Sequence, residues 1–186
     1  MPLISTDFDD LMIFEPIVFE DERGYFYESY NQHVFESNGL NYTWVQDNQA
    51  FSCRGVIRGL HYQTVNMAQA KLVRVIQGEV LDVVVDIRPE SATYGKSFSI
   101  ILSETNKRQL LVPRGFAHGY AVLSDTALFF YKCDNYYSKS HEGGILFNDP
   151  FLEIDWILED NIIQLSEKDK TQPDFKNHRP FLTEKM

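Results

Sequence analysis

Two of the five histidines, His61 and His118, have neighbours that point to proton-transfer chemistry. A neutral imidazole can accept a proton near neutral pH, which makes histidine a frequent general base in enzymes. A single histidine on a strand is nevertheless more often a hydrogen-bonded core or surface residue. The case for a catalytic role therefore rests on the runs that contain them, Arg58-Gly59-Leu60-His61-Tyr62-Gln63 and Pro113-Arg114-Gly115-Phe116-Ala117-His118-Gly119.

Both histidines also lie in stretches that lack acidic residues. The formal net charge of the protein is -10, yet no Asp or Glu occurs from Asn48 to Gly78 or from Asn106 to Ser124. Basic residues inside an acidic protein indicate a localised anionic ligand such as a diphosphate, although solvated strand faces explain them equally well. The net charge argues against nucleic acid and against an anionic membrane as partners. The basic residues of the two stretches are Arg54, Arg58, Lys71, Arg74, Lys107, Arg108 and Arg114.

The sequence contains no motif for a metal or a phosphate-binding loop. It has no His-x-His, no HExxH and no Cys/His cluster, and the strand region Gly78–Ile87 offers only Glu79, Asp82 and Asp86 as ligands. We therefore expect no metal. Gly-x-Gly-x-x-Gly and the P-loop are also missing, so a diphosphate would have to be held by Arg and Lys side chains.

The elements that must position these residues are mainly strands. In Val80–Ile87, apolar residues alternate with Asp82 and Asp86, which predicts a half-buried strand. Similar runs predict strands at Tyr25–Tyr30, Lys71–Ile76, Phe98–Leu102, Gln109–Val112, Ala117–Leu123 and Ala127–Lys132, and short helices at Gln32–Ser37, Asn161–Ile163 and Ser166–Asp169. Many short strands joined by hairpin turns indicate an all-β protein. A jelly-roll β-sandwich with a few short helices fits best.

Length and composition predict a single domain over residues 1–186. The chain is 44% hydrophobic and 14% aromatic, with no repeat or linker. Its N-terminus lacks the features of a secretory signal, and no apolar run approaches the roughly 20 residues of a membrane helix. Cys53 and Cys133 match no zinc or redox spacing, so reduced thiols and a cytoplasmic location are expected.

Several motifs, in this order over one chain, closely resemble the dTDP-4-dehydrorhamnose 3,5-epimerases, a cupin-like jelly-roll family. Any one of them alone is weak, but their order from about Phe14 to Pro173 is specific. The motifs are Arg23-Gly24-Tyr25-Phe26-Tyr27-Glu28, Gln46-Asp47-Asn48, the runs around His61 and His118, Lys71-Leu72-Val73-Arg74-Val75, Gly78-Glu79-Val80, Tyr131-Lys132, Asn148-Asp149-Pro150 and Leu165-Ser166-Glu167-Lys168-Asp169.

This resemblance implies a homodimer that converts dTDP-4-keto-6-deoxy-D-glucose to dTDP-4-keto-L-rhamnose, in dTDP-L-rhamnose biosynthesis, without a cofactor. By the matching motifs, His61 would be the base and Asp169 its carboxylate partner. Tyr131 would be the acid on the other face of the sugar, and Lys71 would stabilise the enolate oxygen. The positions that match substrate contacts are Arg23, Glu28, Gln46, Asn48, Arg58, His118, Glu142 and Lys168.

Each of these assignments has an ordinary structural alternative. By pattern alone Tyr131 is a core aromatic, Asp169 a helix-cap or exposed carboxylate, Lys71 a solvated residue at a strand edge, and Arg23-Gly24 a hairpin turn. The motifs also do not separate a 3,5-epimerase from a relative that inverts only C3 or only C5. A non-catalytic cupin that binds a nucleotide sugar would be expected to have lost the base, its partner or the acid, and this chain has all three.

Overall fold

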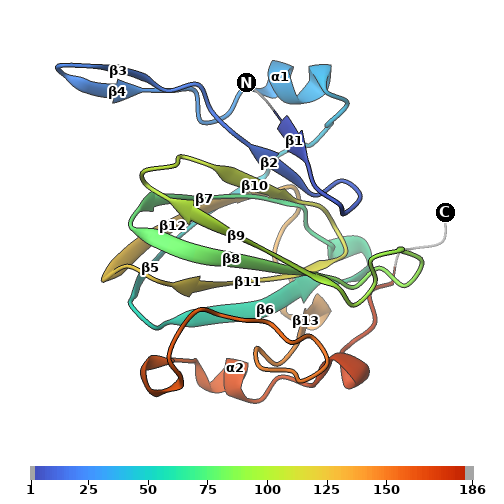
Figure 1. Cartoon of the computed structure of the whole chain (residues 1–186). Coiled ribbons are helices and arrows are strands. Elements are labelled where there is room, and N and C mark those ends of the chain that lie inside the picture. The colour runs from blue at the N-terminus through green and yellow to red at the C-terminus, as the bar shows by residue number, and fades with distance from the viewer. Residues whose placement is uncertain (1–2, 183–186) are drawn as a thin grey trace.

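Antiparallel strands are the main secondary structure of the protein, which a computed structural model describes over residues 3–182 (Figure 1). One sheet has six strands in the order β1-β2-β10-β7-β12-β5, and a second has five in the order β13-β6-β11-β8-β9. The β3-β4 hairpin projects from the sandwich. The strands are β1 (Leu3–Ser5), β2 (Met12–Phe14), β3 (Phe19–Asp21), β4 (Gly24–Phe26), β5 (Gln46–Cys53), β6 (Ile57–Gln63), β7 (Lys71–Gln77), β8 (Glu79–Asp86), β9 (Ser97–Ser103), β10 (Gln109–Val112), β11 (Phe116–Val122), β12 (Thr126–Cys133) and β13 (Glu142–Gly144).

Helices are few and short. Together with the two antiparallel sheets, they confirm the predicted jelly-roll sandwich. They are α1 (Gln32–Ser37), α2 (Glu167–Lys170) and the 3-10 turns η1 (Val65–Met67), η2 (Lys139–His141), η3 (Asp160–Ile162) and η4 (Phe175–Asn177). Within residues 3–182, none of these helices has the length and apolar character needed to cross a membrane.

Strand β8 corrects one expectation from the sequence. Its alternating pattern predicted one wet face, but both faces are buried, and Asp82 and Asp86 are each 0% exposed. The two carboxylates are paired instead of solvated, with His118 and Arg88 respectively. Alternation of polar and apolar residues therefore marked two different buried environments here, because a paired carboxylate can occupy a core position.

The predicted strand Tyr25–Tyr30 is also shorter than expected. Only Gly24–Phe26 pairs, with Phe19–Asp21, to form the hairpin. The remaining residues run into α1, whose N-cap is Asn31. The side chain of Asn31 accepts hydrogen bonds from the backbone N–H groups of His33 and Val34, which fixes the start of this helix.

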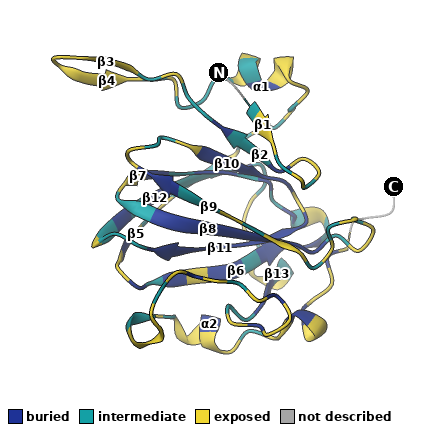
Figure 2. Cartoon of the chain, viewed as in Figure 1, coloured by how far each residue is buried: buried dark blue, intermediate teal, exposed yellow. Residues whose placement is uncertain are grey.

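Apolar residues are buried in three clusters, and Figure 2 shows buried residues along the strands of both sheets. Between the two sheets lies a core that includes Val73, Val84 and Phe129. The C-terminal segment covers the outer face of the five-stranded sheet through residues such as Trp156. The segment around α1 covers the six-stranded sheet through Phe35. The outer face of each sheet is thus covered. The inward-facing side chains of both sheets occupy the space between them.

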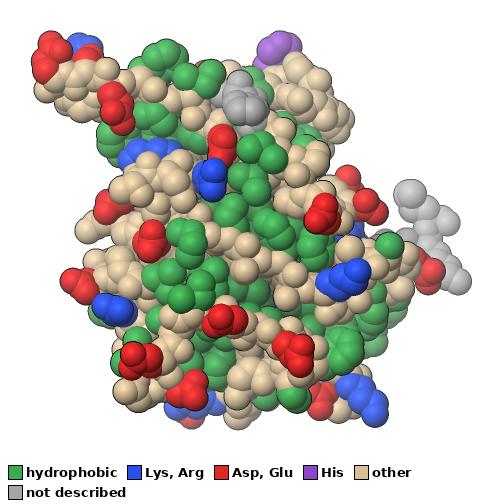
Figure 3. All heavy atoms as spheres, viewed as in Figure 1, with side chains coloured by type: hydrophobic (Ala, Val, Ile, Leu, Met, Phe, Trp, Pro, Cys, Tyr) green, Lys and Arg blue, Asp and Glu red, His purple; other side chains and the backbone are tan. Residues whose placement is uncertain are grey.

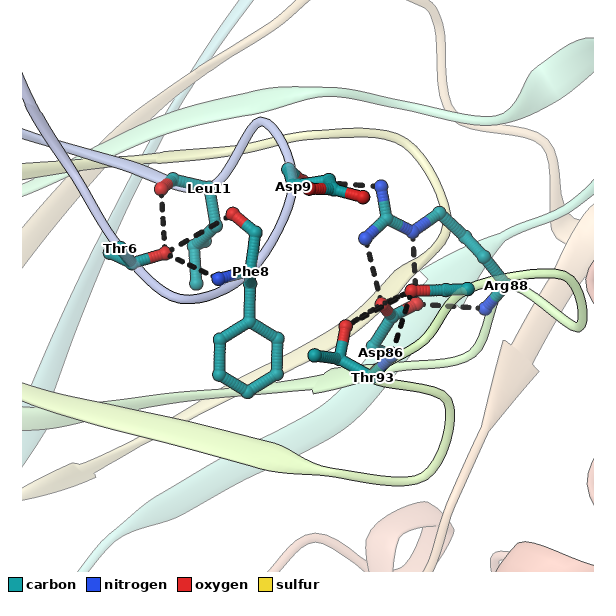
Figure 4. A network of polar contacts seen from close by, with 8 residues as sticks. Thr6, Phe8, Asp9, Leu11, Asp86, Arg88 and Thr93 are labelled. Carbon is teal, nitrogen blue, oxygen red and sulfur yellow. Dashed lines mark hydrogen bonds and ion pairs between the residues drawn. The ribbon is translucent and has the colours of Figure 1, made fainter.

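A buried carboxylate holds the turn after β8 to the rest of the sandwich (Figure 4). Arg88 donates to both oxygens of Asp86, from Nε at 2.9 Å and Nη2 at 2.7 Å. The hydroxyls of Ser91 and Thr93 each donate to Asp86 Oδ2 at 2.6 Å. Arg88 also donates to the carbonyl of Asp9, which ties the N-terminal loop to this turn. Burial raises the pKa of Asp86, but these hydrogen bonds outweigh it and hold the pKa below its ordinary value.

Replacing this carboxylate should destabilise the protein in a pH-dependent way. We expect Asp86→Asn to lower the free energy of unfolding at pH 7 by about 3 kcal/mol, because Arg88 loses a buried partner. Since the folded pKa of Asp86 is depressed, its contribution is present above the unfolded value of 3.8 and is lost as pH falls through the folded value. Urea unfolding at pH 7 and in acid measures both effects.

Asp47→Asn is the matched control, because Asp47 pairs with Lys132 at 3.0 Å but its side chain is 53% exposed. An exposed pair of this kind contributes at most about 1 kcal/mol. Equal losses in the two variants would contradict the role given to the buried network.

Candidate active site

A cavity of about 540 Å³ opens between the two sheets, and His61 and His118 both line it. The two histidines lie directly opposite each other on the antiparallel strands β6 and β11. Opposite residues of a strand pair share a face, so both side chains point into the space between the sheets. The two sequence runs that contain these histidines are therefore neighbours in the fold.

A β-bulge brings Arg58 to the same face as His61. The register pairs Arg58 with Tyr120 and His61 with His118, so two residues of β6 stand opposite Gly119 alone. Residues three apart on a regular strand face opposite sides, and the extra residue of a bulge restores a common face. Arg58, Tyr120 and both histidines thereby line one cavity.

His61 is joined to Asp169, which stands 108 residues later in the chain. The His61 Nε2 atom and Asp169 Oδ1 are 2.5 Å apart, and their side chains are 29% and 4% exposed. Asp169 lies in α2, where the Ser166 hydroxyl donates to Asp169 Oδ2 at 2.8 Å and accepts from its backbone N–H. Ser166, not Asp169, therefore caps this helix. Burial raises the pKa of Asp169, but the contacts with His61 and Ser166 outweigh it and hold the pKa below its ordinary value.

Tyr131 and Lys71 reach the cavity from the opposite sheet. Both line it, Tyr131 from β12 and Lys71 from β7. Burial raises the pKa of Tyr131 to about 12, so its hydroxyl is protonated at neutral pH. Burial lowers the pKa of Lys71, whose Nζ lies 5.8 Å from the centre of the Tyr131 ring. Within residues 3–182 no salt bridge includes Lys71, so its charge faces the cavity without a paired carboxylate.

His118 is held by a second buried carboxylate, Asp82 of β8. The His118 Nε2 atom lies 2.9 Å and 3.0 Å from the two oxygens of Asp82. Burial raises the pKa of Asp82, although His118 and Lys71 counteract this. Sequence analysis missed this partner because Asp82 was assigned to a solvated face. The sequence signal for this pair is an acidic residue within an otherwise apolar strand, because such an acid is expected to pair with a buried base.

A smaller cavity of about 180 Å³ shares His61, Lys71 and Tyr131 with the first. Its wall includes three further predicted site residues, Gln46, Asn48 and Glu142. The Gln46 amide donates to Asn48 Oδ1 at 3.0 Å, which orders the two side chains on β5. Glu142 pairs with Lys168 of α2 at 2.5 Å. The catalytic candidates thus stand where an amide-lined space meets one that contains Arg58 and Lys168.

Arg23 and Glu28 line neither of these cavities. Arg23 stands at the turn of the β3-β4 hairpin, where it pairs with Asp21 and its side chain is 83% exposed. Glu28 accepts a hydrogen bond from Asn31 at 3.1 Å. Of the twelve predicted site residues, these two are not brought to the site by their own chain.

The basic residues of the two acid-free stretches have different roles in the structure. Arg58 and Lys71 line the cavities, as expected for an anionic ligand. Three of the others have different partners, since Arg108 pairs with Glu15, Arg114 pairs with Asp134, and Arg74 lies over a phenylalanine ring. On the face shown in Figure 3, acidic side chains are scattered over the surface without forming one patch. Among residues 3–182, no group of three or more potential ligands is arranged for a metal ion.

The fold and these residues define a class of enzyme. A jelly-roll sandwich of cupin type places a histidine–carboxylate pair and a protonated tyrosine on opposite walls of one cavity, with a cation beside them. Such a pair of walls can remove a proton from one face of a carbon and return one to the other, which is the chemistry of an epimerase.

Comparison with known proteins identifies the family. The family model for dTDP-4-dehydrorhamnose 3,5-epimerase matches residues 5–177, and the chain belongs to this family of isomerases. A dTDP-4-dehydrorhamnose 3,5-epimerase from Shigella flexneri is 54% identical over 91% of this chain and 93% of its own. The crystal structure of the Elizabethkingia anophelis enzyme has a TM-score of 0.91 and 54% identity, over 95% of this chain and 97% of that one. The Legionella pneumophila enzyme, in complex with dTDP-4-keto-L-rhamnose, has a TM-score of 0.91 and 47% identity, over 95% and 93% of the two chains.

The bulge in β6 should tolerate no side chain at Gly59. A Cβ there would lie 2.5 Å from the Cα of Gly119, and Gly59 has a φ of +138°. We expect Gly59→Ala to lower the free energy of unfolding by roughly 2 kcal/mol or more, because both the backbone and the neighbouring strand must shift. Turnover should fall as well, since Arg58 and His61 flank this residue. Chemical unfolding and steady-state kinetics measure the two effects.

Gly39→Ala is the control, because Gly39 has a φ of +80° but nothing lies within 4 Å of its Cβ position. It should show only the cost of the left-handed backbone, with normal turnover. A Gly59 variant that matches it in both measurements would refute the close-approach argument.

Proposed function

We propose that this chain converts dTDP-4-keto-6-deoxy-D-glucose to dTDP-4-keto-L-rhamnose in dTDP-L-rhamnose biosynthesis, by inversion at C3 and C5. The observation that supports it most directly is the His61–Asp169 pair on one wall of a cavity whose other wall presents Tyr131. The activity of the named relatives agrees with this chemistry.

In the proposed reaction His61 removes the proton next to the ketone. Asp169 remains ionised at neutral pH because its pKa is lowered, so it can orient the imidazole and stabilise the imidazolium once it forms. The electron pair of the broken C–H bond moves into an enolate, whose oxygen carries the developing charge. Lys71 stabilises that oxygen, because an unpaired cation in a partly desolvated site acts strongly on charge that develops during the reaction.

Tyr131 completes the inversion from the other face. Its pKa of about 12 keeps the hydroxyl protonated, so it can donate a proton to the carbon that the base has left. The enolate then returns to the ketone with the opposite configuration. The ketone itself makes the neighbouring proton acidic, and we propose that neither a metal nor another cofactor takes part.

The remaining predicted residues fit the two ends of such a substrate. Arg58 and Lys168 suit the diphosphate, because a cation with several donors matches phosphoryl oxygens. Gln46, Asn48 and Glu142 suit the sugar, since amide and carboxylate groups exchange hydrogen bonds with hydroxyls. We propose that His118, fixed by Asp82, is a further sugar contact.

A second candidate function is inversion at C3 alone or at C5 alone on a related nucleotide sugar. The same base, partner and acid would serve either reaction, so it remains the alternative. A non-catalytic nucleotide-sugar-binding cupin has less support, because His61, Asp169 and Tyr131 all line the cavity.

Deuterium exchange from heavy water tests these roles. With dTDP-4-keto-6-deoxyglucose, NMR should find deuterium at both C3 and C5 for the unmodified enzyme. His61→Ala should lose exchange at both carbons by roughly 10²–10⁴, because no enolate forms without the base. Tyr131→Phe should retain some exchange while net inversion falls, since His61 can return a deuteron to the same face. Asp169→Asn should behave as a weakened His61 variant.

Two results would exclude this mechanism: full epimerisation by Tyr131→Phe, or normal exchange by His61→Ala. Deuterium at only one carbon in the unmodified enzyme would instead favour the single-position alternative. Asp47→Asn serves as the control for handling, because Asp47 lies on the outer face of β5.

We further propose a cytoplasmic homodimer in which all of residues 1–186 act as one domain. The β3-β4 hairpin supports the dimer, because Phe19, Tyr25 and Phe26 are 64%, 56% and 68% exposed on an arm that extends from the sandwich (Figure 1). Exposed aromatic residues on a projecting arm are typical of surfaces that a partner covers. A second copy would also explain how Arg23 contacts the substrate. Arg23 does not line the cavity of its own chain, but it could reach the cavity of the partner.

Mixed dimers test this arrangement. Arg23→Ala and His61→Ala should each have low activity, but co-expressed chains should recover part of it. In a mixed dimer, one cavity would have its own His61 and the partner's intact arm. Light scattering reports the dimer, and turnover reports the complementation. A monomer at micromolar concentration would refute the dimer, and a dimer without recovered activity would refute only the shared site.

A further inference from the structure

The hydroxyl of Tyr120 is a buried polar group that has no partner. Tyr120 is 4% exposed, and its Oη makes no hydrogen bond with any group of residues 3–182. Native proteins pair almost all buried hydroxyls, because an unpaired one loses its hydrogen bonds to water and gains nothing in return. Phenylalanine at this position would fill the same space without that cost. The hydroxyl therefore calls for an explanation outside the stability of the free protein.

Tyr120 is held firmly on the wall of the larger cavity. It stands opposite Arg58 across the β11-β6 pair, one pair along from His118 and His61. Its ring stacks on Phe129, with centroids 4.1 Å apart and planes 17° apart. Both rings line the cavity. The position of the hydroxyl is thus fixed by the bulge on one side and by the opposite sheet on the other.

Two side chains near this hydroxyl, those of Ser52 and Arg58, are hydrogen-bond donors. Arg58 Nε donates to Ser52 Oγ at 3.1 Å, which orients the guanidinium. Within residues 3–182 Arg58 has no carboxylate partner, so its two Nη groups stay available. Burial raises the pKa of Tyr120, as does the Asp82 carboxylate opposite it on β8, while the nearby donors of Ser52 and Arg58 lower it. A protonated phenol and a guanidinium side by side match an anionic oxygen.

We propose that Tyr120 is a further ligand-binding residue, whose hydroxyl donates a hydrogen bond to a diphosphate oxygen of the nucleotide sugar beside Arg58. The inference rests on the proposed function, since it requires a nucleoside diphosphate in this cavity. A phosphoryl oxygen satisfies the phenol and the guanidinium together, whereas a neutral sugar hydroxyl would leave the charge of Arg58 unused. Tyr120 then contributes to binding, and the proton transfers remain with His61 and Tyr131.

Tyr120→Phe is the decisive variant, because it removes the hydroxyl and keeps the stacked ring. Calorimetry with dTDP as the probe should show roughly tenfold weaker binding or more, the usual effect of a hydrogen bond to a charged group. With substrate, KM should rise while kcat stays near that of the unmodified enzyme. The melting temperature without ligand should be unchanged or higher, because an unpaired buried hydroxyl has been removed.

Tyr62→Phe is the matched control, because the buried Tyr62 hydroxyl donates to the carbonyl of Arg179. It should show the opposite behaviour, a lower melting temperature with unchanged dTDP affinity. Unchanged dTDP affinity in Tyr120→Phe would overturn the inference and leave the epimerase proposal intact. A lower melting temperature in that variant would also overturn it, since the hydroxyl would then have a partner in the fold. Failure of the unmodified protein to bind dTDP would overturn both.

Discussion

The pairing of β6 with β11 is the constraint on which the site depends. Because one strand has an extra residue opposite Gly119, Arg58 and His61 point to the same side although they are three residues apart. Two cross-strand rows result, His61 with His118 and Arg58 with Tyr120. This geometry requires Gly59 and Gly119 to approach each other closely. Both residues are glycine because neither position has room for a Cβ. A regular ladder would turn one of the two rows toward the C-terminal layer, away from the cavity.

The remaining groups of the site are placed by elements that converge on those rows. The six-stranded sheet contributes Tyr131 and Lys71, and α2 contributes Asp169. Behind them, the buried Asp82 fixes His118 and lies close enough to Lys71 to influence its charge. Buried ionisable groups are costly unless they are paired, and burial lowers the pKa of Lys71. Lys71 is half-buried and Arg58 is exposed, and neither has a carboxylate partner within residues 3–182.

Much of this could be predicted from the sequence, for reasons that are local. Short runs of strand-forming and helix-forming residues predict the strand Gln109–Val112 and the helix Gln32–Ser37, because each depends on neighbouring residues. The alternation of apolar and polar residues gives no indication of the bulge in β6. The pairing of Asp82 with His118 was likewise missed, because alternation cannot distinguish water from a buried partner across a strand. Nothing in the sequence distinguishes Tyr120 from a core aromatic, since only tertiary packing shows that its hydroxyl is unpaired.

Burial shifts the pKa of two groups of the site in the same direction, and their neighbours then make the two pKa values differ. Desolvation raises the pKa of both Asp169 and Tyr131, because each becomes negative when it ionises. Asp169 is surrounded by donors from His61 and Ser166, which reverse the effect and keep it charged. Within residues 3–182 the Tyr131 hydroxyl has no comparable set of donors, so its pKa rises to about 12 and it stays protonated. At neutral pH one wall therefore favours proton removal and the other proton donation, and the direction of the proposed first step follows from this difference.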